Sequence, residues 1–183
     1  MSPRGEALQR VLDATAALIP ELGWGNVSAR LIAGRAGVSL GVVHYYAHSV
    51  DELRRRAALR SVRAYFEAAM HSVLAPGTTS LRQGLAGVFD ALTAGDPHRP
   101  ELLLLYETLV AAPRDPELRD ELAALVAQLR TRLSEWFAAQ GVADPDQMAA
   151  LTAASIDGYL LQRCLDPGLS PAPVAAGLAA ALG

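Results

Sequence analysis

Two histidines, His44 and His48, are the first candidates for chemistry in this sequence, because residues four apart can share one face of a helix. A zinc site needs three or four ligands, and no cluster of Cys, His or carboxylate residues accompanies this pair. The sequence also contains no nucleophile–base pair and no glycine-rich phosphate loop. It therefore predicts neither a metal site, nor a cofactor site, nor an enzyme.

The arginines near these histidines indicate a different chemistry, the recognition of a polyanion. Residues 1–63 hold nine Arg and five acidic residues, a net charge of +4, whereas residues 64–183 hold seven Arg and fourteen acidic residues, a net charge of −7. Together they give the −3 of the whole chain. A basic third on an acidic body favours a polyanionic partner for that third. The alternative is chance clustering of charge on a solvated surface.

Residues 28–46 have the pattern of two short helices joined by a tight turn. Ser28 can cap a helix that runs to about residue 36, and a second helix is expected over residues 40–46. Between them, Gly37 supplies the positive φ that such a turn needs. Three apolar side chains are placed to fill the space between the helices: Ile32, Val38 and Val43. In a helix-turn-helix of this kind, the second helix lies in the major groove of DNA.

The elements that must position this motif are helical as well. Leu and Ala dominate the composition, while strand formers are sparse. An apolar stripe over residues 8–19 predicts a helix that Pro20 and Gly23 stop, and the Thr15 hydroxyl on that stripe can bond to a carbonyl one turn earlier. Ser49 and Glu52 form a capping-box pattern at the start of a long fourth helix.

Prolines and glycines then divide the rest of the chain into five more helices. Pro76-Gly77 is expected to close the fourth helix, and the later helices are expected over residues 79–94, 100–111, 115–140, 144–165 and 170–182. Asp115 and Asp144 are candidate caps, each followed by a proline. The predicted fold is therefore all-α, with about nine helices and no strands.

The sequence also indicates the cellular compartment of the protein. A single cysteine, Cys164, excludes a disulfide framework within the chain and favours a reducing cytosol. The first residues lack the apolar run of a signal peptide, and no stretch of about 18 apolar residues predicts a membrane span. We expect a cytoplasmic protein with no membrane partner.

The helix-turn-helix residues resemble the DNA-binding signature of the TetR family of transcriptional regulators. The matching residues are Ile32-Ala33, Arg35-Ala36-Gly37-Val38-Ser39 and Gly41, and the likeness extends over about residues 6–56. The chain length and the helix count also fit this family. The resemblance implies an N-terminal DNA-binding domain of three helices over residues 1–50 and a helical ligand-sensing and dimerisation domain over residues 51–183.

Carried over position by position, the resemblance implies nine DNA-binding residues: Ser28, Arg30, Ser39, Leu40, Gly41, Val42, His44, Tyr45 and His48. The helix that follows Ser28 would present its N-terminus to a phosphate. Arg30 would reach a phosphate or a guanine, and Val42 a thymine methyl group. Tyr45 and His48 would donate hydrogen bonds to phosphates.

Several positions leave alternatives open. Arg30 could be a solvated surface charge, and His44 could pack in the core of the small domain. Leu40 and Val50 stand where the family commonly has lysines that contact phosphates. The run at residues 54–56 could supply added positive potential, or form a solvated face beside acidic neighbours. These departures motivate an alternative function, a helical ligand sensor or adaptor with weak or lost DNA binding.

By the same resemblance, a ligand pocket is expected among the middle helices. Large or polar residues on apolar stripes are its candidates, although each could be an ordinary core residue: Tyr65, Phe66, Met70, Phe89, Tyr106, Glu107, Trp136 and Tyr159. Glu107 stands out because a buried carboxylate is unfavourable unless it is paired. It is the candidate partner of a cationic or hydroxylated ligand.

The resemblance further implies a homodimer held by the last two helices, over residues 145–165 and 171–182, with two recognition helices about one DNA turn apart. A ligand would shift the population towards a conformation whose recognition helices no longer match the operator. The sequence thus predicts a repressor released from a palindromic operator by a small molecule. A purely structural helical bundle is disfavoured by the turn at Gly37.

Overall fold

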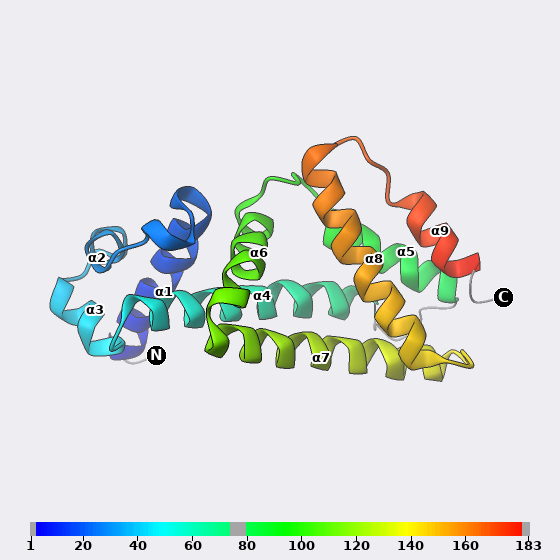
Figure 1. Ribbon diagram of the computed structural model, residues 1–183, viewed down its shortest axis with the longest axis horizontal. Coiled ribbons are helices and arrows are strands. Elements are labelled where there is room, and N and C mark those ends of the chain that lie inside the picture. The colour runs from blue at the N-terminus through cyan, green and yellow to red at the C-terminus, as the bar shows by residue number, and fades with distance from the viewer. Residues whose placement is uncertain (1–2, 74–79, 181–183) are drawn as a thin grey trace. The chain divides into compact units, whose positions relative to one another are not determined.

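The computed structural model describes residues 3–73 and 80–180. Its elements, in chain order, are α1 (Pro3–Leu22), the short turn η1 (Trp24–Asn26), α2 (Ala29–Ala36), α3 (Leu40–Tyr46), α4 (Val50–Val73), α5 (Leu81–Thr93), α6 (Pro100–Ala111), the short turn η2 (Ala112–Arg114), α7 (Pro116–Ala139), α8 (Pro145–Leu165) and α9 (Ala172–Ala180). Over these described ranges the prediction of nine helices and no strand is confirmed (Figure 1).

The chain divides into two compact units. Unit 1 comprises residues 1–64 and 100–122, and unit 2 comprises residues 65–99 and 123–183. The helices α4 and α7 both begin in unit 1 and continue into unit 2. Unit 1 thus contains α6 in addition to the N-terminal helices, a long-range association that helical periodicity does not encode. The functional boundary at residue 50 stays a prediction.

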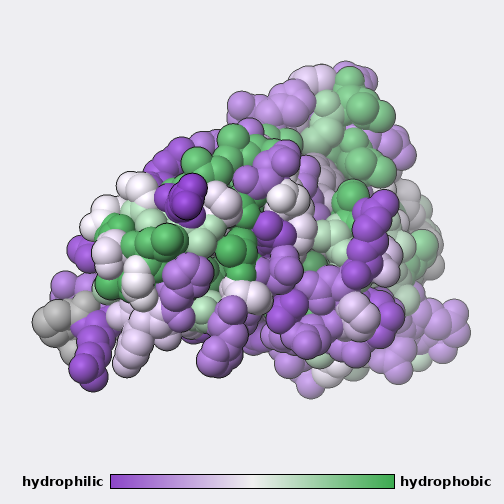
Figure 2. All heavy atoms as spheres, turned by 60° about the vertical axis from the view of Figure 1, so that its left-hand side comes forward, coloured by the Kyte–Doolittle hydropathy of each residue, from purple (hydrophilic) through white to green (hydrophobic). Residues whose placement is uncertain are grey.

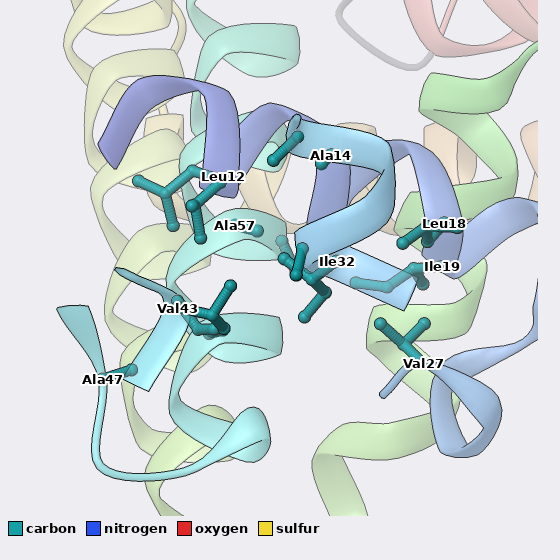
Figure 3. Close-up of a cluster of buried hydrophobic side chains, with 14 of the residues drawn as sticks. Leu12, Ala14, Leu18, Ile19, Val27, Ile32, Val43, Ala47 and Ala57 are labelled. Carbon is teal, nitrogen blue, oxygen red and sulfur yellow. The ribbon is translucent and has the colours of Figure 1, made fainter. Parts of the chain in front are cut away.

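The core of unit 1 is built by α1, α2, α3 and the start of α4, with one residue from α6. Figure 3 shows Ile32 and Val43 pointing into the same cluster as Leu12 and Ile19. Val38 packs against the edge of that cluster, so the three predicted spacers lie where expected. Thr15 is fully buried within α1, and its hydroxyl donates to the Val11 carbonyl oxygen at 2.7 Å, as predicted.

Local signals at the ends of α2 explain why this helix is short. The Ser28 hydroxyl accepts a hydrogen bond from the Leu31 N–H at 3.4 Å. At the other end Gly37 has φ 64°, a left-handed conformation that disfavours any residue with a Cβ. The Val38 N–H then bonds the Ala33 carbonyl at 3.1 Å, which closes the helix with a Schellman motif.

The first helix differs from its prediction at one point, because α1 continues through Pro20 to Leu22. A proline removes one helical hydrogen bond, which near a C-terminus does not offset the burial of Leu18 and Ile19. The helix ends at Gly23, where φ is 84° and the N–H bonds the Ile19 carbonyl oxygen at 2.8 Å. Gly23 is thus the stop signal, and Pro20 is not.

Ser49 starts α4 as predicted, since its hydroxyl accepts from the Glu52 N–H at 3.1 Å. The Glu52 carboxylate reaches one residue further back than a capping box requires, and accepts from the His48 N–H at 2.9 Å. The expected end of this helix at Pro76-Gly77 lies outside the described residues, as does the expected start of the next helix at Thr79.

The later helix starts follow the prolines, but their caps differ. Asp115 caps α7, with its carboxylate accepting from the Leu118 N–H at 3.1 Å. The helix α8 begins at Pro145, yet Asp144 makes no side-chain capping bond; Asp146 instead accepts a hydrogen bond from the Ser134 hydroxyl. The predicted end of the last helix at Leu182 lies beyond the described part of the chain.

Unit 2 packs α5, α7, α8 and α9 around a second core. Phe89 and Phe137 are almost fully buried, and the Phe89 ring meets the Tyr159 ring edge-on with centroids 5.9 Å apart. Leu160 and Leu178 bury the inner faces of α8 and α9. None of the helices that the structure describes is long and apolar enough to cross a membrane.

Candidate functional site

The exposed side of α3 is the first candidate for a binding surface. Val43 and Ala47 are buried and fix this helix on the core of unit 1. The residues on its other side project outwards, and Tyr45 is 70% exposed. The other predicted contact residues at this helix are exposed, except Val42, which is half-buried: Ser39, Leu40, Gly41, His44 and His48. The recognition-helix candidates are therefore accessible together.

The start of α2 adds two of the predicted residues. Ser28 is exposed, but its hydroxyl is engaged in capping the helix. Arg30 is exposed and has no side-chain hydrogen bond or ion pair within the described ranges. Ser28 therefore acts through the shape of the helix start, whereas the Arg30 guanidinium is available for a partner.

His44 and His48 are both exposed, so His44 is not a core residue. Among the residues that the structure describes, no three His, Cys, Asp or Glu side chains form a group that could hold a metal ion.

The molecular surface on this side of the protein is neither uniformly polar nor uniformly apolar. Hydrophobic and hydrophilic residues intermingle in Figure 2, in which the side of Figure 1 that carries α1 to α3 is turned forward. Leu31 and Leu40 are two of its apolar residues, and they are 45% and 39% exposed to solvent.

Tyr46 is a positioning residue that helical periodicity did not identify. Its hydroxyl donates to the Arg4 carbonyl oxygen at 2.7 Å, and thereby ties the start of α1 to the end of α3. The Tyr46 ring also meets the Tyr45 ring at 5.2 Å in an edge-to-face arrangement. Tyr46 is half-buried against the core, so it orients the exposed Tyr45.

The arginine run at residues 54–56 is engaged within the protein. Arg54 pairs with Asp51 at 2.6 Å and donates to the Val27 carbonyl oxygen at 2.7 Å. Arg56 donates to the Tyr46 carbonyl oxygen at 2.8 Å. These two arginines hold together the loops around α3. Their positive charge is partly neutralised by acidic neighbours, and the Arg54 side chain is largely buried rather than solvated.

Arg55, the middle residue of that run, links α4 to the start of α7. Its guanidinium lies 3.1 Å from the Asp115 carboxylate and 2.6 Å from the Glu117 carboxylate. Burial alone would raise the pKa of Asp115, but the Leu118 N–H and the Arg55 guanidinium together lower it. Unit 1 therefore carries an ionic contact between residues 60 positions apart, which no local pattern signals.

Two further arginines of the basic third are paired. Arg35 forms two hydrogen bonds with the Glu21 carboxylate, at 2.8 and 2.6 Å, and these lower the pKa of Glu21. Arg60 pairs with Asp13 at 2.5 Å. Four exposed arginines make no side-chain hydrogen bond or ion pair with the described residues: Arg4, Arg10, Arg30 and Arg63. The positive potential of unit 1 that is open to a partner comes mainly from these four.

Unit 2 contains a small cavity between α4, α5, α7 and α8. Its volume is about 30 Å³, and it is lined by Phe66, Met70, Val88, Leu92, Val126, Leu129, Leu133, Ala153, Ile156 and Asp157. Phe66 and Met70 are the two predicted ligand-binding residues that this cavity brings together. The other six predicted ligand-binding residues do not line this cavity.

Four of the predicted ligand-binding residues that do not line the cavity have structural partners in unit 2. The Tyr65 hydroxyl donates to the Leu92 carbonyl oxygen at 2.7 Å, and the Tyr65 ring lies beneath the Arg99 guanidinium, so Tyr65 braces the end of α5. Phe89 packs on Tyr159, whose hydroxyl donates to the Leu169 carbonyl oxygen at 2.7 Å. Trp136 is buried with its ring 4.8 Å from the Phe137 ring.

Tyr106 and Glu107 belong to unit 1. The Glu107 carboxylate accepts a hydrogen bond from the Trp24 N–H at 2.7 Å. Glu107 lines a polar groove of about 560 Å³ together with the side chains of Arg54, Arg55 and Arg114. Three leucines before it on α6 are buried, namely Leu102, Leu104 and Leu105, but the Glu107 carboxylate itself binds the first residue of η1. The sequence could not show this, because the two residues are 83 positions apart.

The acidic residue at the cavity of unit 2 is Asp157, which the sequence did not single out as a ligand contact. The available signal was its spacing from Ala153 and Ile156, which places it at the edge of the buried face of α8. Burial raises the pKa of Asp157, and the positive charge of Arg130 acts in the opposite direction.

The outer face of α8 exposes three leucines that follow helical spacing. Leu151, Leu161 and Leu165 are 47%, 57% and 85% exposed, whereas Ile156 and Leu160 on the inner face are buried. Apolar residues on both faces of one helix are typical of a helix whose outer face packs against a partner. This is where the sequence predicted pairing between subunits.

Comparison with known proteins identifies relatives over both parts of the chain. Residues 76–183 match a family profile described as the tetracyclin repressor-like C-terminal domain. An uncharacterized HTH-type transcriptional regulator of Mycobacterium tuberculosis is 26% identical over 133 residues. That match covers 72% of this chain and 66% of the relative.

Solved structures give similar matches over nearly the whole chain. A member of the TetR family from Streptomyces coelicolor A3 is 29% identical with a TM-score of 0.77, and the match covers 99% of this chain and 98% of that one. The multidrug binding protein EbrR complexed with imidazole is 30% identical with a TM-score of 0.75, and the match covers 96% of this chain and 93% of that one.

Proposed function

Because the chain belongs to the TetR family of transcriptional regulators, we propose that it is a repressor that binds a palindromic operator and is released by a small molecule. Regulators of this family bind operator DNA and small-molecule ligands and are dimers. The observation that carries the proposal is the exposed side of α3, on which Tyr45 and His44 project from a helix anchored by Val43.

DNA recognition in this proposal combines base contacts by α3 with phosphate contacts beside it. The second helix of a helix-turn-helix places its N-terminal residues at base edges, which assigns this role to Ser39, Gly41 and Val42. Tyr45, His44 and His48 then donate to phosphates. Arg30, which has no internal ion pair in the described structure, supplies a positive charge for a phosphate.

Dimerisation is proposed through α8 and α9. The exposed leucines of α8 form an apolar stripe that a two-fold partner can cover with its own copy. Such a dimer presents two α3 helices to successive turns of DNA. The functional boundary at residue 50 is retained in this proposal, with sensing and pairing assigned to residues 51–183.

The effector is proposed to enter the cavity of unit 2. Phe66 and Met70 line it, and an apolar lining with one polar residue is typical of a ligand site. The related EbrR has been solved with imidazole and with proflavin, which supports a small organic effector for this chain. Proteins of this family are generally not enzymes, and we propose no catalytic activity and a cytoplasmic location.

The test is a selection of bound sequences from random DNA by the full-length protein, followed by footprinting. A palindromic site protected on one face of the duplex is the expected result, and a metabolite screen for its release then tests repression. Failure to select any sequence at low salt would contradict the proposal.

A sensor or adaptor with weak DNA binding is the second candidate function. Leu40 and Val50 lack the charge of the lysines they replace, and the residues at 54–56 are engaged with acidic side chains and carbonyl oxygens. This candidate predicts a stable dimer that binds a small molecule but shifts no DNA. The same selection from random DNA separates the two candidates, because this one selects no sequence.

A further inference from the structure

One carboxylate lies among the apolar residues that line the cavity of unit 2. Nine of the ten lining residues are apolar, and they come from α4, α5, α7 and α8. The tenth is Asp157 on α8, one residue after the buried Ile156. Any ligand that occupies this cavity must therefore meet an apolar wall and one acidic group.

Asp157 has no partner of its own within the described structure. It forms no hydrogen bond and no ion pair there, and its interaction with Arg130 is a longer-range attraction. Asp157 is an exposed residue at the edge of the cavity lining, and its partial burial there raises its pKa. A carboxylate at the edge of an apolar wall attracts a positive group that comes to lie beside it.

Two other acidic side chains, Glu67 and Glu107, are already engaged within the protein. Glu67 on α4 lies 2.8 Å from the Arg132 guanidinium. Glu107, the carboxylate that the sequence favoured as a ligand partner, accepts the Trp24 N–H in unit 1. Asp157 is thus the acidic group of this cavity that remains available to an incoming ligand.

We propose that the effector of this protein is an amphipathic cation, with its positive group at Asp157 and its apolar part among Phe66, Met70 and Leu133. The proposal rests on the proposed function, because it names the chemical class of the effector that enters unit 2. A neutral molecule of the same shape leaves Asp157 unpaired, and an anion is repelled by it. Affinity therefore decreases from cation to neutral molecule to anion.

The small volume of the cavity means that a ligand can bind only if the cavity expands. A volume of about 30 Å³ accommodates only one or two water molecules, whereas small-molecule sites occupy roughly 300 Å³ or more. Binding must therefore move lining side chains, and Met70 has the flexible, unbranched side chain that adapts most easily. Ligand binding is thereby coupled to a rearrangement of α4, α5, α7 or α8, which a regulator requires.

Calorimetric titration of the full-length protein tests this ligand class. The probes are two cations, benzyltrimethylammonium and tetraphenylphosphonium, with neopentylbenzene as the neutral isostere and phenylmethanesulfonate as the anion. We expect at least one cation to bind the wild type, and to bind Asp157→Asn about tenfold more weakly. Asp90→Asn, which removes an exposed charge from α5 outside the cavity lining, is the matched control and keeps wild-type affinity.

Three results overturn the proposal. They are tighter binding of the neutral or anionic probe than of the cations, unchanged cation affinity in Asp157→Asn, and no binding of either cation. Asp157→Glu retains the charge, so it is expected to retain most of the cation affinity and serves as a second variant if Asp157→Asn unfolds.

A gel shift on the operator selected by the wild type separates this proposal from the proposed function. Asp157→Asn is expected to bind the operator with wild-type affinity, while the cation that releases the wild type no longer releases the variant. If no protein binds DNA, the proposed function fails, and calorimetry still decides whether unit 2 selects cations.

Discussion

The two candidate sites of this protein are built from the sequence in different ways. The surface around α3 comes from one continuous segment, and its turn, caps and spacers all lie between Ser28 and Ala47. The cavity of unit 2 collects single residues from four helices between Phe66 and Asp157. Local signals determine the first site, and long-range packing determines the second. The two sites should therefore respond differently to comparable substitutions.

Deleting one core side chain in each unit should produce the largest effects. Ile32→Ala removes a fully buried side chain beneath α3, and Leu133→Ala removes one that lines the cavity. Each is expected to lower the free energy of unfolding by about 3 kcal/mol. Chemical denaturation measures these losses. Only Ile32→Ala should also weaken operator binding in a gel shift, because it loosens the anchoring of α3.

Equal losses of DNA affinity in the two variants, after correction for the folded fraction, would contradict the separation of the two sites. Leu133→Ala offers a second measurement, since it enlarges the effector cavity. Its affinity for tetraphenylphosphonium should change, whereas that of Ile32→Ala should stay at the wild-type value.

The turn before α3 should be the next most sensitive position. Gly37→Val places a β-branched residue at φ 64°, which we expect to destabilise the protein by about 2 kcal/mol. Gly34→Ala is the matched control, because Gly34 lies inside α2 with open space at its Cβ position. That change should stabilise the protein by about 0.5 kcal/mol. Thermal unfolding of both variants measures the difference, and a neutral Gly37→Val would show that the turn can adopt another conformation.

The fold was predictable from the sequence to the extent that its signals were local. Ser28, Gly37, Ser49 and Asp115 all mark helix ends where the sequence placed them. The prediction that Pro20 ends the first helix was wrong, because a proline near a helix end removes only one hydrogen bond from a helix that burial stabilises. The DNA-contact assignments depend on a continuous segment and so could be made residue by residue.

The cavity could not be assigned in the same way. Hydrophobic periodicity identifies the buried face of a helix, but it does not say which buried faces meet. Phe66 and Met70 were named because they are large, and Glu107 because it follows an apolar run, yet Glu107 packs in unit 1 with Trp24. Asp157 becomes informative only when its neighbours on α4, α5 and α7 are known.

Two arginines on α2 test which charges of unit 1 face DNA. Arg30 has no internal ion pair in the described structure, whereas Arg35 is held by two hydrogen bonds to Glu21. Arg30→Gln should lower operator affinity about fivefold and reduce the slope of log affinity against log salt by about 1. Arg35→Gln should leave that slope nearly unchanged. Fluorescence anisotropy across a salt series measures both, and a larger slope change for Arg35→Gln would reverse the assignment.

The smallest expected effect is electrostatic and depends on pH. The pKa of Asp115 is lowered in the folded protein, despite burial that opposes this, by the Leu118 N–H and the Arg55 guanidinium. A lowered folded-state pKa contributes stability that is fully present above the ordinary value of 3.8 and is lost as the pH falls below it.

Asp115→Asn retains a capping side chain but removes the charge, so it should lower stability at pH 7 by about 1 kcal/mol. The difference between wild type and variant should shrink below pH 4. Urea unfolding at pH 7 and pH 3.5 measures it, and Asp120→Asn, at an exposed position of the same helix, is the matched control. A difference that grows at acid pH would mean that the Arg55–Asp115 contact does not stabilise unit 1.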